Sequence, residues 1–446
     1  MVVLRGGVIV TEMMVEVMVE EDVLLPLRGQ TVVVVGMGYV GLPTALSLVS
    51  KGARVMGLDA SAARLRNIHH GSVDLSARDM ERLRQYRSGA QLDLSEDPEV
   101  LSDADYVVIC VPTPVDDYQA PDLAALQGAC DSVVERAKAG QTIILTSTTY
   151  VGCTRKMLVE PLAARGLVAG QDISVVFSPE RINPGVADHM PELTPRVVGG
   201  TTANCLLAGQ EFLSHISSTV HVVTSLETAE MTKLMENTFR AVNIALANEF
   251  SDVANELGVD IVEAVDAAAT KPYGFMAFYP GAGVGGHCIP CDPHYLLWQL
   301  RGRRVIAPVI QSAMEAISVR PRRVVERARM VLGESGRTLA NARVLVVGVT
   351  YKPGVADVRE SPALEIIDGL MHLGAKVSYV DPFVPALDTP LGGRLLSQTN
   401  ADQFAKIWDL VIVHTVHPGQ DYGWLENSFA VLDTTYRLDF PNRHVL

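Results

Sequence analysis

One stretch decides the fold: Thr31-Val-Val-Val-Val-Gly-Met-Gly-Tyr-Val-Gly41. Its β-branched run over residues 31–35 is typical of a buried parallel strand. The GxGxxG that follows predicts a tight turn, close backbone approach to a ligand, and packing of a helix on the strand. The N-terminus of that helix offers free N–H groups and a partial positive charge to a pyrophosphate. We therefore predict a dinucleotide site formed by Gly36, Gly38, Tyr39, Val40 and Gly41.

The next predicted strand, 54–58, ends at Asp59, whose position supports a dinucleotide site. Its carboxylate can accept hydrogen bonds from a ribose diol and would repel a 2′-phosphate, which favours NAD over NADP. Arg64, in the helix that follows, is assigned to the same site. Without the acidic residue the glycine motif would be weak evidence, because a glycine-rich turn without a ligand is the alternative.

Further short apolar runs alternate with helical patterns along the chain. Strands are predicted at 106–111, 142–146, 174–177, 343–347, 376–380, 410–414 and 430–433. This alternation predicts an α/β fold, with a doubly wound parallel sheet in a Rossmann-type first domain and a smaller second α/β domain. The second unit lacks the later glycines of a dinucleotide loop after Gly348, so we expect no second dinucleotide site there.

A long helical pattern separates the two α/β units. Large apolar residues recur at helical spacing between Met231 and Leu257, and Gly258 is placed to end the helix. Such a helix is typical of a connector between domains or of a subunit interface, so we expect a homodimer. The predicted divisions are a disordered extension at 1–29, a dinucleotide-binding domain at 30–223, a central helical domain at 224–332 and a C-terminal substrate domain at 333–446.

The composition is that of a soluble globular protein, with 48% hydrophobic and 20% charged residues. No apolar run approaches the ~20 residues of a membrane-spanning helix. The N-terminal segment lacks the basic start and cleavage site of a secretory signal. A net charge of −14 argues against a nucleic-acid surface, and six cysteines without framework spacing favour a reducing cytoplasm.

The most informative loop is Gly281-Ala-Gly-Val-Gly-Gly-His-Cys-Ile-Pro-Cys-Asp292. Its glycines let the backbone approach a ligand closely around one thiol. The residues alone leave three interpretations open. In the first, Cys288 is a covalent nucleophile, with a pKa lowered by a cation or a helix N-terminus. Alternatively, Cys288 and Cys291 form a redox CxxC, or they join His287 and His294 in a metal site. The chain has no second ligand pair of similar spacing, and a thioredoxin-like CxxC would open a helix in a different kind of domain.

With motifs elsewhere, this loop gives the chain its resemblance to a known family. The markers are 36–41, Val111-Pro-Thr-Pro114, Ser147-Thr-Thr149, Ser178-Pro-Glu-Arg181, 233–237, 285–292 and Asp357-Val-Arg-Glu-Ser361. From about residue 31 to 433 the chain resembles the UDP-sugar 6-dehydrogenases, which act on UDP-glucose, UDP-N-acetylglucosamine and UDP-N-acetylmannosamine. The resemblance implies a four-electron oxidation of a C6 alcohol to a uronic acid with two NAD in succession, in polysaccharide biosynthesis and without a metal.

The resemblance also implies roles for individual residues. Cys288 adds to the aldehyde left by the first hydride transfer, and the second transfer leaves a thioester that water hydrolyses. Lys233 and Asn237 stabilise the developing oxyanion, although their spacing alone favours an ordinary polar stripe on a long helix. The other catalytic residues implied are Asp292, which organises the thiol, Glu180, which assists hydrolysis, and Thr148, which holds the water.

Binding residues follow from the same resemblance. Beyond the glycine loop, the implied cofactor residues are Pro112, Thr113, Thr148 and Arg359. The implied substrate residues are Glu180, Arg181, Lys233, Asn237, Phe278, Tyr279, Gly281, Gly285, Lys352 and Arg437. The alternative for Lys352 and Arg359 is that both are ordinary surface cations without a binding role.

The choice of sugar rests on two stretches, 177–185 and 273–281, which are closer to the N-acetylhexosamine branch of the family. They favour UDP-GlcNAc or UDP-ManNAc over UDP-glucose. Alternatives from other classes are a two-electron hydroxyacid-type dehydrogenase, which would not need Cys288, and a non-catalytic nucleotide-sugar sensor. Cys291 replaces an ordinary apolar residue of the family, and we hypothesise that it forms a reversible disulfide with Cys288 under oxidation.

Overall fold

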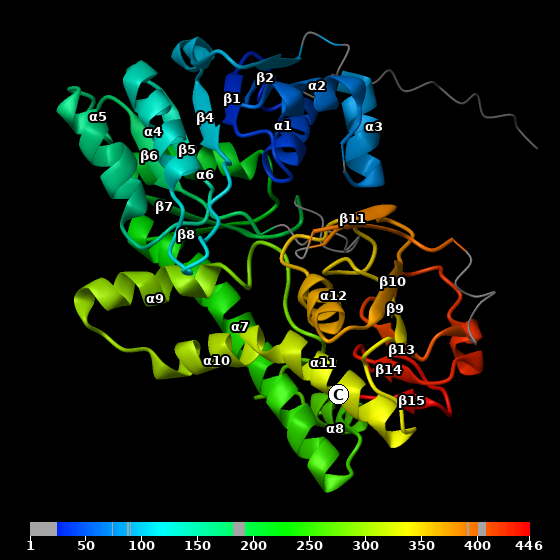
Figure 1. Ribbon diagram of the computed structural model, residues 1–446. Helices are drawn as coiled ribbons and strands as arrows, with labels where there is room; N and C mark the ends of the chain where they lie inside the picture. The colour runs from blue at the N-terminus through cyan, green and yellow to red at the C-terminus, as the bar shows by residue number, and fades with distance from the viewer. Residues whose placement is uncertain are drawn as a thin grey trace, which may run out of the picture.

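The computed structural model describes residues 25–73, 75–86, 89, 91–181, 192–389, 392–399 and 407–446. Figure 1 shows an N-terminal α/β unit, a long central helix running diagonally away from it, and a C-terminal α/β unit beside that helix. This arrangement confirms the predicted fold class. Part of the stretch compared with the N-acetylhexosamine branch, 182–185, lies outside the described residues. None of the described helices is long and apolar enough to cross a membrane.

The N-terminal sheet has the strand order β3-β2-β1-β4-β5-β6-β7-β8. Its strands are β1 (Thr31–Val35), β2 (Arg54–Leu58), β3 (Leu92–Ser95), β4 (Tyr106–Ile109), β5 (Thr142–Leu145), β6 (Ser174–Phe177), β7 (Arg196–Gly200) and β8 (Val220–Val223). Because β1 pairs in parallel with both β2 and β4, the order reverses there, and a ligand crevice is expected at its carboxyl end. The expected parallel sheet is wrong at one pair, since β6 and β7 are antiparallel and need no crossover helix.

Helices pack against this sheet. They are α1 (Gly41–Ser50), α2 (Ala62–His70), α3 (Ala77–Tyr86), α4 (Ala124–Arg136), α5 (Glu160–Ala164), which follows a π-helical turn (Arg155–Val159), and α6 (Ala203–Ser214). Leu27 is also buried in this core at 1% exposure. Residues 25–29 therefore belong to the folded domain, which corrects the expected disordered extension, and residues 1–24 lie outside the described part.

The central unit is built on α7 (Leu226–Leu257), with Ser225 capping its N-terminus and Gly258 ending it at φ 68°. The remaining helices are α8 (Ile261–Ala269), α9 (Asp292–Arg303), α10 (Pro308–Ser318) and α11 (Arg320–Glu334). The predicted long helix is confirmed, but its apolar pattern does not mark the buried face. Small residues such as Ala241, Ala245 and Ser251 are buried, whereas large side chains such as Phe250 and Leu257 are exposed.

The C-terminal sheet is parallel, with the order β10-β9-β13-β14-β15. Its strands are β9 (Arg343–Val347), β10 (Lys376–Val380), β13 (Leu410–Val413), β14 (Val431–Asp433) and β15 (Arg443–His444), and α12 (Pro362–His372) follows β9. A separate antiparallel pair is formed by β11 (Ala386–Asp388) and β12 (Arg394–Leu396). β9 and β10 lie where the sequence predicted them, and β13 and β14 are each one residue shorter than predicted.

Candidate active site

The glycine loop after β1 has the geometry that a dinucleotide needs. Gly36 has φ +90°, and a Cβ on Gly41 would lie 1.8 Å from the Gly36 carbonyl oxygen. Both positions therefore require glycine for backbone conformation and packing. At Gly38 a Cβ would meet nothing within 4 Å, so the space outside that residue is open to a pyrophosphate. The residues present fit NAD at this loop.

Asp59 and Arg64 fix this loop from the neighbouring strand and helix. The Met37 N–H donates to Asp59 Oδ2 at 2.8 Å, and Arg64 Nε donates to the Met37 carbonyl oxygen at 2.7 Å. The Ser61 N–H donates to the other oxygen of Asp59 at 2.8 Å. Asp59 therefore presents its carboxylate at the end of β2 beside the glycine loop, where the ribose of a dinucleotide would lie.

The next two loops reach the same edge of the sheet. Pro112 and Thr113 follow β4, and Thr148 follows β5, so parallel pairing places all three beside the glycine loop. The Tyr295 hydroxyl of α9 donates to the Thr113 carbonyl oxygen at 3.1 Å, which ties this edge to the helix after the cysteine loop. The predicted cofactor residues thus converge on one crevice.

Three polar residues from two helices form the wall around the thiol. Asn237 Nδ2 donates to Asp292 Oδ2 at 2.5 Å, and these side chains are only 5% and 3% exposed. Lys233 lies one helical turn before Asn237 and donates from Nζ to the Glu180 carbonyl oxygen at 2.9 Å. The ordinary solvated stripe that spacing favoured is therefore wrong for Asn237, because this amide is buried against an acid.

The thiol itself departs from one expectation. Burial raises the pKa of Cys288, and the nearby Asp292 carboxylate raises it further, whereas Lys233, Arg240 and Arg359 lower it. The expected net lowering by a cation or helix N-terminus is wrong, because burial outweighs the three cations. Arg240, two turns after Lys233 on α7, is a cation near the thiol that the sequence did not single out.

Asp292 is the buried acid of this cluster. Burial raises the pKa of its carboxyl to about 6, while Lys233 and the hydrogen bond from Asn237 oppose that rise. The acid therefore changes charge just below neutral pH, where it can exchange a proton with the thiol or with water.

Asp292→Asn is expected to stabilise the fold at neutral pH. The folded-state pKa of about 6 lies above the usual unfolded value, so the parent loses stability as pH rises from about 4 to 6 and stays lower above that range. Removing the charge should raise the free energy of unfolding at pH 8 by roughly 2–3 kcal/mol, with a much smaller gain at pH 4. Urea unfolding at the two pH values measures this, and equal gains at both would contradict the assignment.

A stack of side chains from three units closes over the thiol. The Tyr39 ring of the glycine loop stacks on His287 with centroids 5.8 Å apart, and the Arg359 guanidinium lies 5.3 Å from the Tyr39 ring. Asp357 holds Arg359 through hydrogen bonds of 2.6–3.1 Å. The sequence analysis assigned Arg359 to the cofactor site, but it did not predict that His287 would stack in this contact. Burial lowers the pKa of His287, which favours its neutral form.

Two glycines of the cysteine loop explain how the C-terminal unit docks. A Cβ at Gly285 would lie 2.6 Å from the Glu360 carbonyl oxygen and from Tyr351 Cβ. Gly286 has φ +77°, and its N–H donates to the Arg359 carbonyl oxygen at 3.1 Å. The structure therefore gives Gly285, predicted to bind substrate, a packing role between the two segments.

The predicted substrate residues are only partly gathered. Tyr279, Gly281 and Arg437 line one cavity of about 210 Å³ at the carboxyl ends of β13 and β14. Tyr351 and Pro353, on either side of Lys352, line it too, and burial lowers the pKa of Lys352. Phe278 does not line this cavity and instead meets Phe239 edge-on, with ring centroids 6.1 Å apart.

Two predicted residues at the end of β6 are engaged in ion pairs. Glu180 pairs with the buried Arg196 at 2.6 Å, and Arg181 pairs with Glu236 of α7. Arg181 also donates to the Pro195 carbonyl oxygen at 2.9 Å. These contacts hold the segment whose Glu180 carbonyl oxygen accepts from Lys233. Arg181 therefore binds α7 and does not line the cavity that contains Tyr279 and Arg437.

The loop after β9 resembles the glycine loop after β1, but the acid beside it, Asp381, is covered by another side chain. Val349 N–H donates to Asp381 Oδ2 at 2.7 Å, as Met37 does to Asp59. Here, however, His417 Nε2 lies 3.1 Å from the same Asp381 oxygen, and this pair is almost fully buried. The carboxylate has no free face for a ribose, which explains physically why this loop is unsuited to a second dinucleotide.

The other two interpretations of the cysteine loop can be compared with its geometry. The described residues contain no group of three or more His, Cys, Asp or Glu side chains arranged to hold a metal ion. The CxxC does open a helix, since the Cys291 N–H donates to the Cys288 carbonyl oxygen at 3.3 Å directly before α9. It does so inside a helical connector, not in a thioredoxin-like domain.

Comparison with known proteins accounts for most of the chain. The model for the NAD binding domain of the UDP-glucose/GDP-mannose dehydrogenase family matches residues 30–220. The models for the central domain and the UDP binding domain of that family match 227–316 and 345–441. The three matches occur in the order in which the fold presents its three units.

Individual relatives match over similar lengths. The chain is 33% identical over 358 residues to the UDP-N-acetyl-D-glucosamine 6-dehydrogenase of Salmonella typhi, covering 80% of this chain and 83% of the relative. It is 33% identical over 416 residues to an NDP-N-acetyl-D-galactosaminuronic acid dehydrogenase of Ralstonia nicotianae, covering 91% and 95%. The UDP-D-ManNAc dehydrogenase structure from Pyrococcus horikoshii matches with a TM-score of 0.85 at 29% identity, covering 93% and 99%.

These matches confirm the predicted resemblance and NAD as the cofactor. The glycine loop, the thiol wall and the cavity at the C-terminal sheet occupy the three matched units in turn. The chain therefore belongs to the UDP-glucose/GDP-mannose dehydrogenase family.

Proposed function

We propose that this enzyme oxidises the C6 alcohol of a UDP-N-acetylhexosamine to the uronic acid, through a thioester on Cys288. The observation that carries the proposal is the buried contact of Asn237 with Asp292, which sets α7 and α9 against each other around the thiol. NAD bound at the glycine loop supplies a hydride acceptor for each of two oxidations. A need for stability does not explain Asp292, since a buried acid with a raised pKa lowers stability at neutral pH.

The residues divide the chemistry between them. Lys233 and Asn237 face the C6 oxygen, and the ammonium stabilises the negative charge that develops there. Asp292, with a pKa of about 6, accepts the proton of the Cys288 thiol as sulfur bonds to the aldehyde carbon. Loss of the second hydride leaves the thioester, and Thr148 and Glu180 direct the water that displaces sulfur and releases the carboxylate.

The sugar is proposed from the relatives. Those of Salmonella, Ralstonia and Pyrococcus are named for N-acetylated glucosamine, galactosamine and mannosamine derivatives, which differ in ring stereochemistry but share the C2 substituent. This supports an N-acetylhexosamine over glucose. The cavity lined by Tyr279 and Arg437 is the proposed place for the uridine diphosphate.

Counting NADH tests this function. Purified enzyme is incubated with NAD and, separately, UDP-GlcNAc, UDP-ManNAc, UDP-GalNAc, UDP-glucose and UDP-galactose, and NADH is counted per sugar consumed. We expect two NADH and a carboxylate with one N-acetylated sugar. One NADH per sugar would support a two-electron dehydrogenase, and tight sugar binding without NADH would support a sensor.

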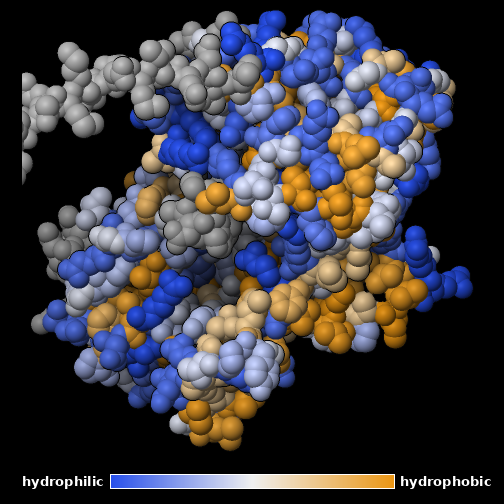
Figure 2. Space-filling model, turned by 180° about the vertical axis from the view of Figure 1, so that it is seen from behind, coloured by the Kyte–Doolittle hydropathy of each residue, from blue (hydrophilic) through white to orange (hydrophobic). Residues whose placement is uncertain are grey.

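We further propose that two copies associate through α7. Its exposed large side chains are Met231, Met235, Phe239, Leu246, Phe250, Val253 and Leu257. Figure 2 shows hydrophobic side chains gathered on the lower part of the molecule, where Figure 1 places the far end of α7 and the α9–α10 pair. A patch of this kind on a long helix is typical of a subunit interface.

Phe250→Glu is expected to convert the dimer to a monomer, because each interface would bury two new charges. Sedimentation of the parent and variant measures the change. Tyr118→Glu, on an exposed loop of the N-terminal domain, serves as the control and should leave the mass unchanged. A parent that sediments as a monomer would contradict the proposal.

The location proposed for the reaction is the cytoplasm, and its product is proposed to enter polysaccharide biosynthesis. All six cysteines are free thiols in the structure, which fits a reducing compartment. An activated uronic acid is a suitable donor for a glycosyl transfer reaction. Fractionation of cells with the NADH assay would place the activity, and recovery outside the cytoplasmic fraction would contradict this.

Cys291→Val is expected to make inactivation by peroxide irreversible. In the parent, peroxide oxidises the Cys288 thiol to a sulfenic acid with release of water, and the Cys291 thiol displaces a second water to give a disulfide. In the variant the sulfenic acid has no thiol partner, so a second peroxide oxidises it to a sulfinic acid with release of water, which dithiothreitol does not reduce. Burial and the nearby Asp292 raise the pKa of Cys291 to about 12, so this second step should be slow. Activity after dithiothreitol is the measurement. Equal recovery in parent and variant would show that no disulfide protects Cys288.

A further inference from the structure

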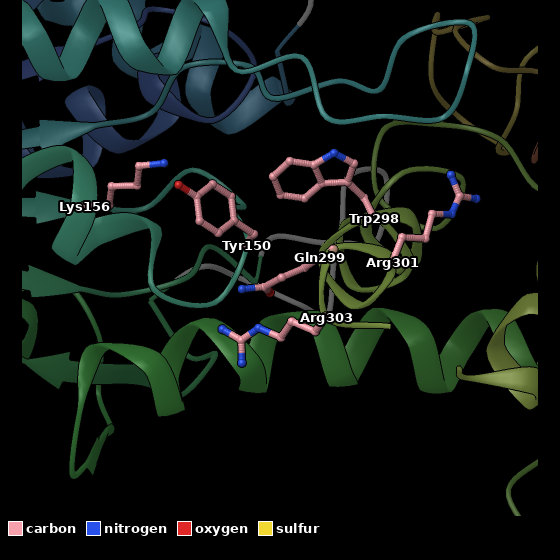
Figure 3. A pocket seen from close by; sticks show the side chains of 7 residues that line it. Tyr150, Lys156, Trp298, Gln299, Arg301 and Arg303 are labelled. Carbon is pink, nitrogen blue, oxygen red and sulfur yellow. The ribbon is translucent and has the colours of Figure 1, made fainter. Parts of the chain in front are cut away.

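A second cavity is lined by residues that have no assigned part in the reaction. Its volume is about 460 Å³, and its lining residues are Tyr150, Lys156, Trp298, Gln299, Arg301, Gly302 and Arg303. They come from the segment after β5 and from the C-terminal half of α9 (Figure 3). The volume falls in the range of small-molecule sites.

Two aromatic side chains, Tyr150 and Trp298, form part of the wall of this cavity. Tyr150 and Trp298 lie with ring centroids 5.5 Å apart and tilted by 56°. Figure 3 shows the two rings side by side, and the Trp298 side chain remains 38% exposed. Gln299 fixes the wall, because its side chain donates to the Val151 carbonyl oxygen at 2.7 Å and accepts from the Val151 N–H at 3.2 Å.

The charges around the rings are all positive. The side chains of Lys156, Arg301 and Arg303 have no hydrogen bond or ion pair with any residue in the part of the chain that the structure describes. No aspartate or glutamate is among the described lining residues, although the chain as a whole carries a net charge of −14. Three cations without an acidic partner around one cavity give it a positive potential, which attracts an anion. Burial lowers the pKa of His294, on the same helix, and Arg301 lowers it further, in keeping with that positive potential.

Figure 3 shows the three cationic side chains on different sides of the two rings. We propose that this cavity binds a nucleoside phosphate, with its base against Trp298 and its negative charge drawn to the cationic rim that Lys156, Arg301 and Arg303 form. A flat ring and a compact negative charge are the two features that these walls complement, since bases stack on aromatic side chains and guanidinium groups pair with phosphate oxygens. The bound molecule would touch both the loop that carries Thr148 and the helix that begins with Asp292.

Equilibrium dialysis with labelled nucleotides tests the site. Cys288→Ala enzyme is saturated with NADH and UDP, so that the catalytic cofactor and substrate sites are filled, and AMP, GMP and UMP are added separately. We expect at least one of them to bind saturably at one equivalent per chain. The affinity should fall at least tenfold in Trp298→Leu and in Arg301→Gln/Arg303→Gln. Arg322→Gln, an exposed cation on α11, should bind like the parent.

Two outcomes would overturn the proposal. The first is no saturable binding of any nucleotide, and the second is binding that all four proteins share. If the first is found and the Arg301/Arg303 variant also changes in sedimentation, the cavity would be assigned to contact with a second copy. NADH production is not needed for the measurement, and unchanged NADH binding by each variant shows that it is folded.

Discussion

Cys288→Ala is expected to abolish complete oxidation, lowering the rate of uronic acid formation by about 10³-fold or more. The first hydride transfer needs no thiol, so a single turnover should still yield up to one NADH per active site. The second requires a carbon that bears both sulfur and a transferable hydride. Without Cys288 the aldehyde has only water as a weakly activated nucleophile. NADH burst size and product analysis by mass spectrometry measure the two steps separately.

Cys291→Val is the matched control, because it removes a buried thiol three residues away that we do not place in the reaction. It should retain activity within a few-fold. If Cys288→Ala still delivers two NADH per sugar at the parent rate, the thioester route is excluded. Unchanged turnover with one NADH would instead favour the two-electron class.

Lys233→Met has the second largest expected effect, a fall in kcat of about 10²–10³-fold with a smaller change in KM. The ammonium group is held by the Glu180 carbonyl oxygen at 2.9 Å beside the thiol wall, so it can act on charge that develops in the transition state. Its loss should also move the acid limb of the pH–rate profile upward from pH 6, because Lys233 opposes the raised pKa of Asp292.

Steady-state kinetics from pH 5 to 9 measure the two effects of this variant together. Lys138→Met removes an exposed lysine of the N-terminal domain and should leave both kcat and the profile unchanged. A rise in KM without a fall in kcat would show that Lys233 binds the ground state equally well and does not act on the oxyanion. An unshifted acid limb would remove Asp292 as the titrating group.

Local patterns predicted the regular elements where each is decided by its own residues. β1, β2, β6, β9 and β10 lie at the predicted residues because each is a short, mostly apolar stretch that ends directly before a glycine, serine or aspartate. The antiparallel β6–β7 pair was not predicted, since strand direction depends on a connection and not on the residues of either strand. α7 was predicted in length but not in orientation.

The orientation of α7 shows the limit of periodicity. Hydrophobic spacing marks which residues share a face, and it does not say whether that face meets the same chain or a second one. Here the alanines and Ser251 pack inward, while Phe250 and Leu257 remain exposed. The long-range neighbours that decide this lie elsewhere in the sequence.

The sequence by itself determined the dinucleotide loop, the acid Asp59, the thiol loop and the family, because each rests on short motifs that can be recognised without knowing which segments meet in space. Only the tertiary structure decided that Asn237 is buried against Asp292, that Tyr39 stacks on His287 beside Arg359, and that Arg181 is committed to Glu236. The physical reason is that burial and the charges of distant segments set pKa values and hydrogen-bond partners. Burial therefore raises the pKa of Cys288, although three cations lie close enough to oppose it.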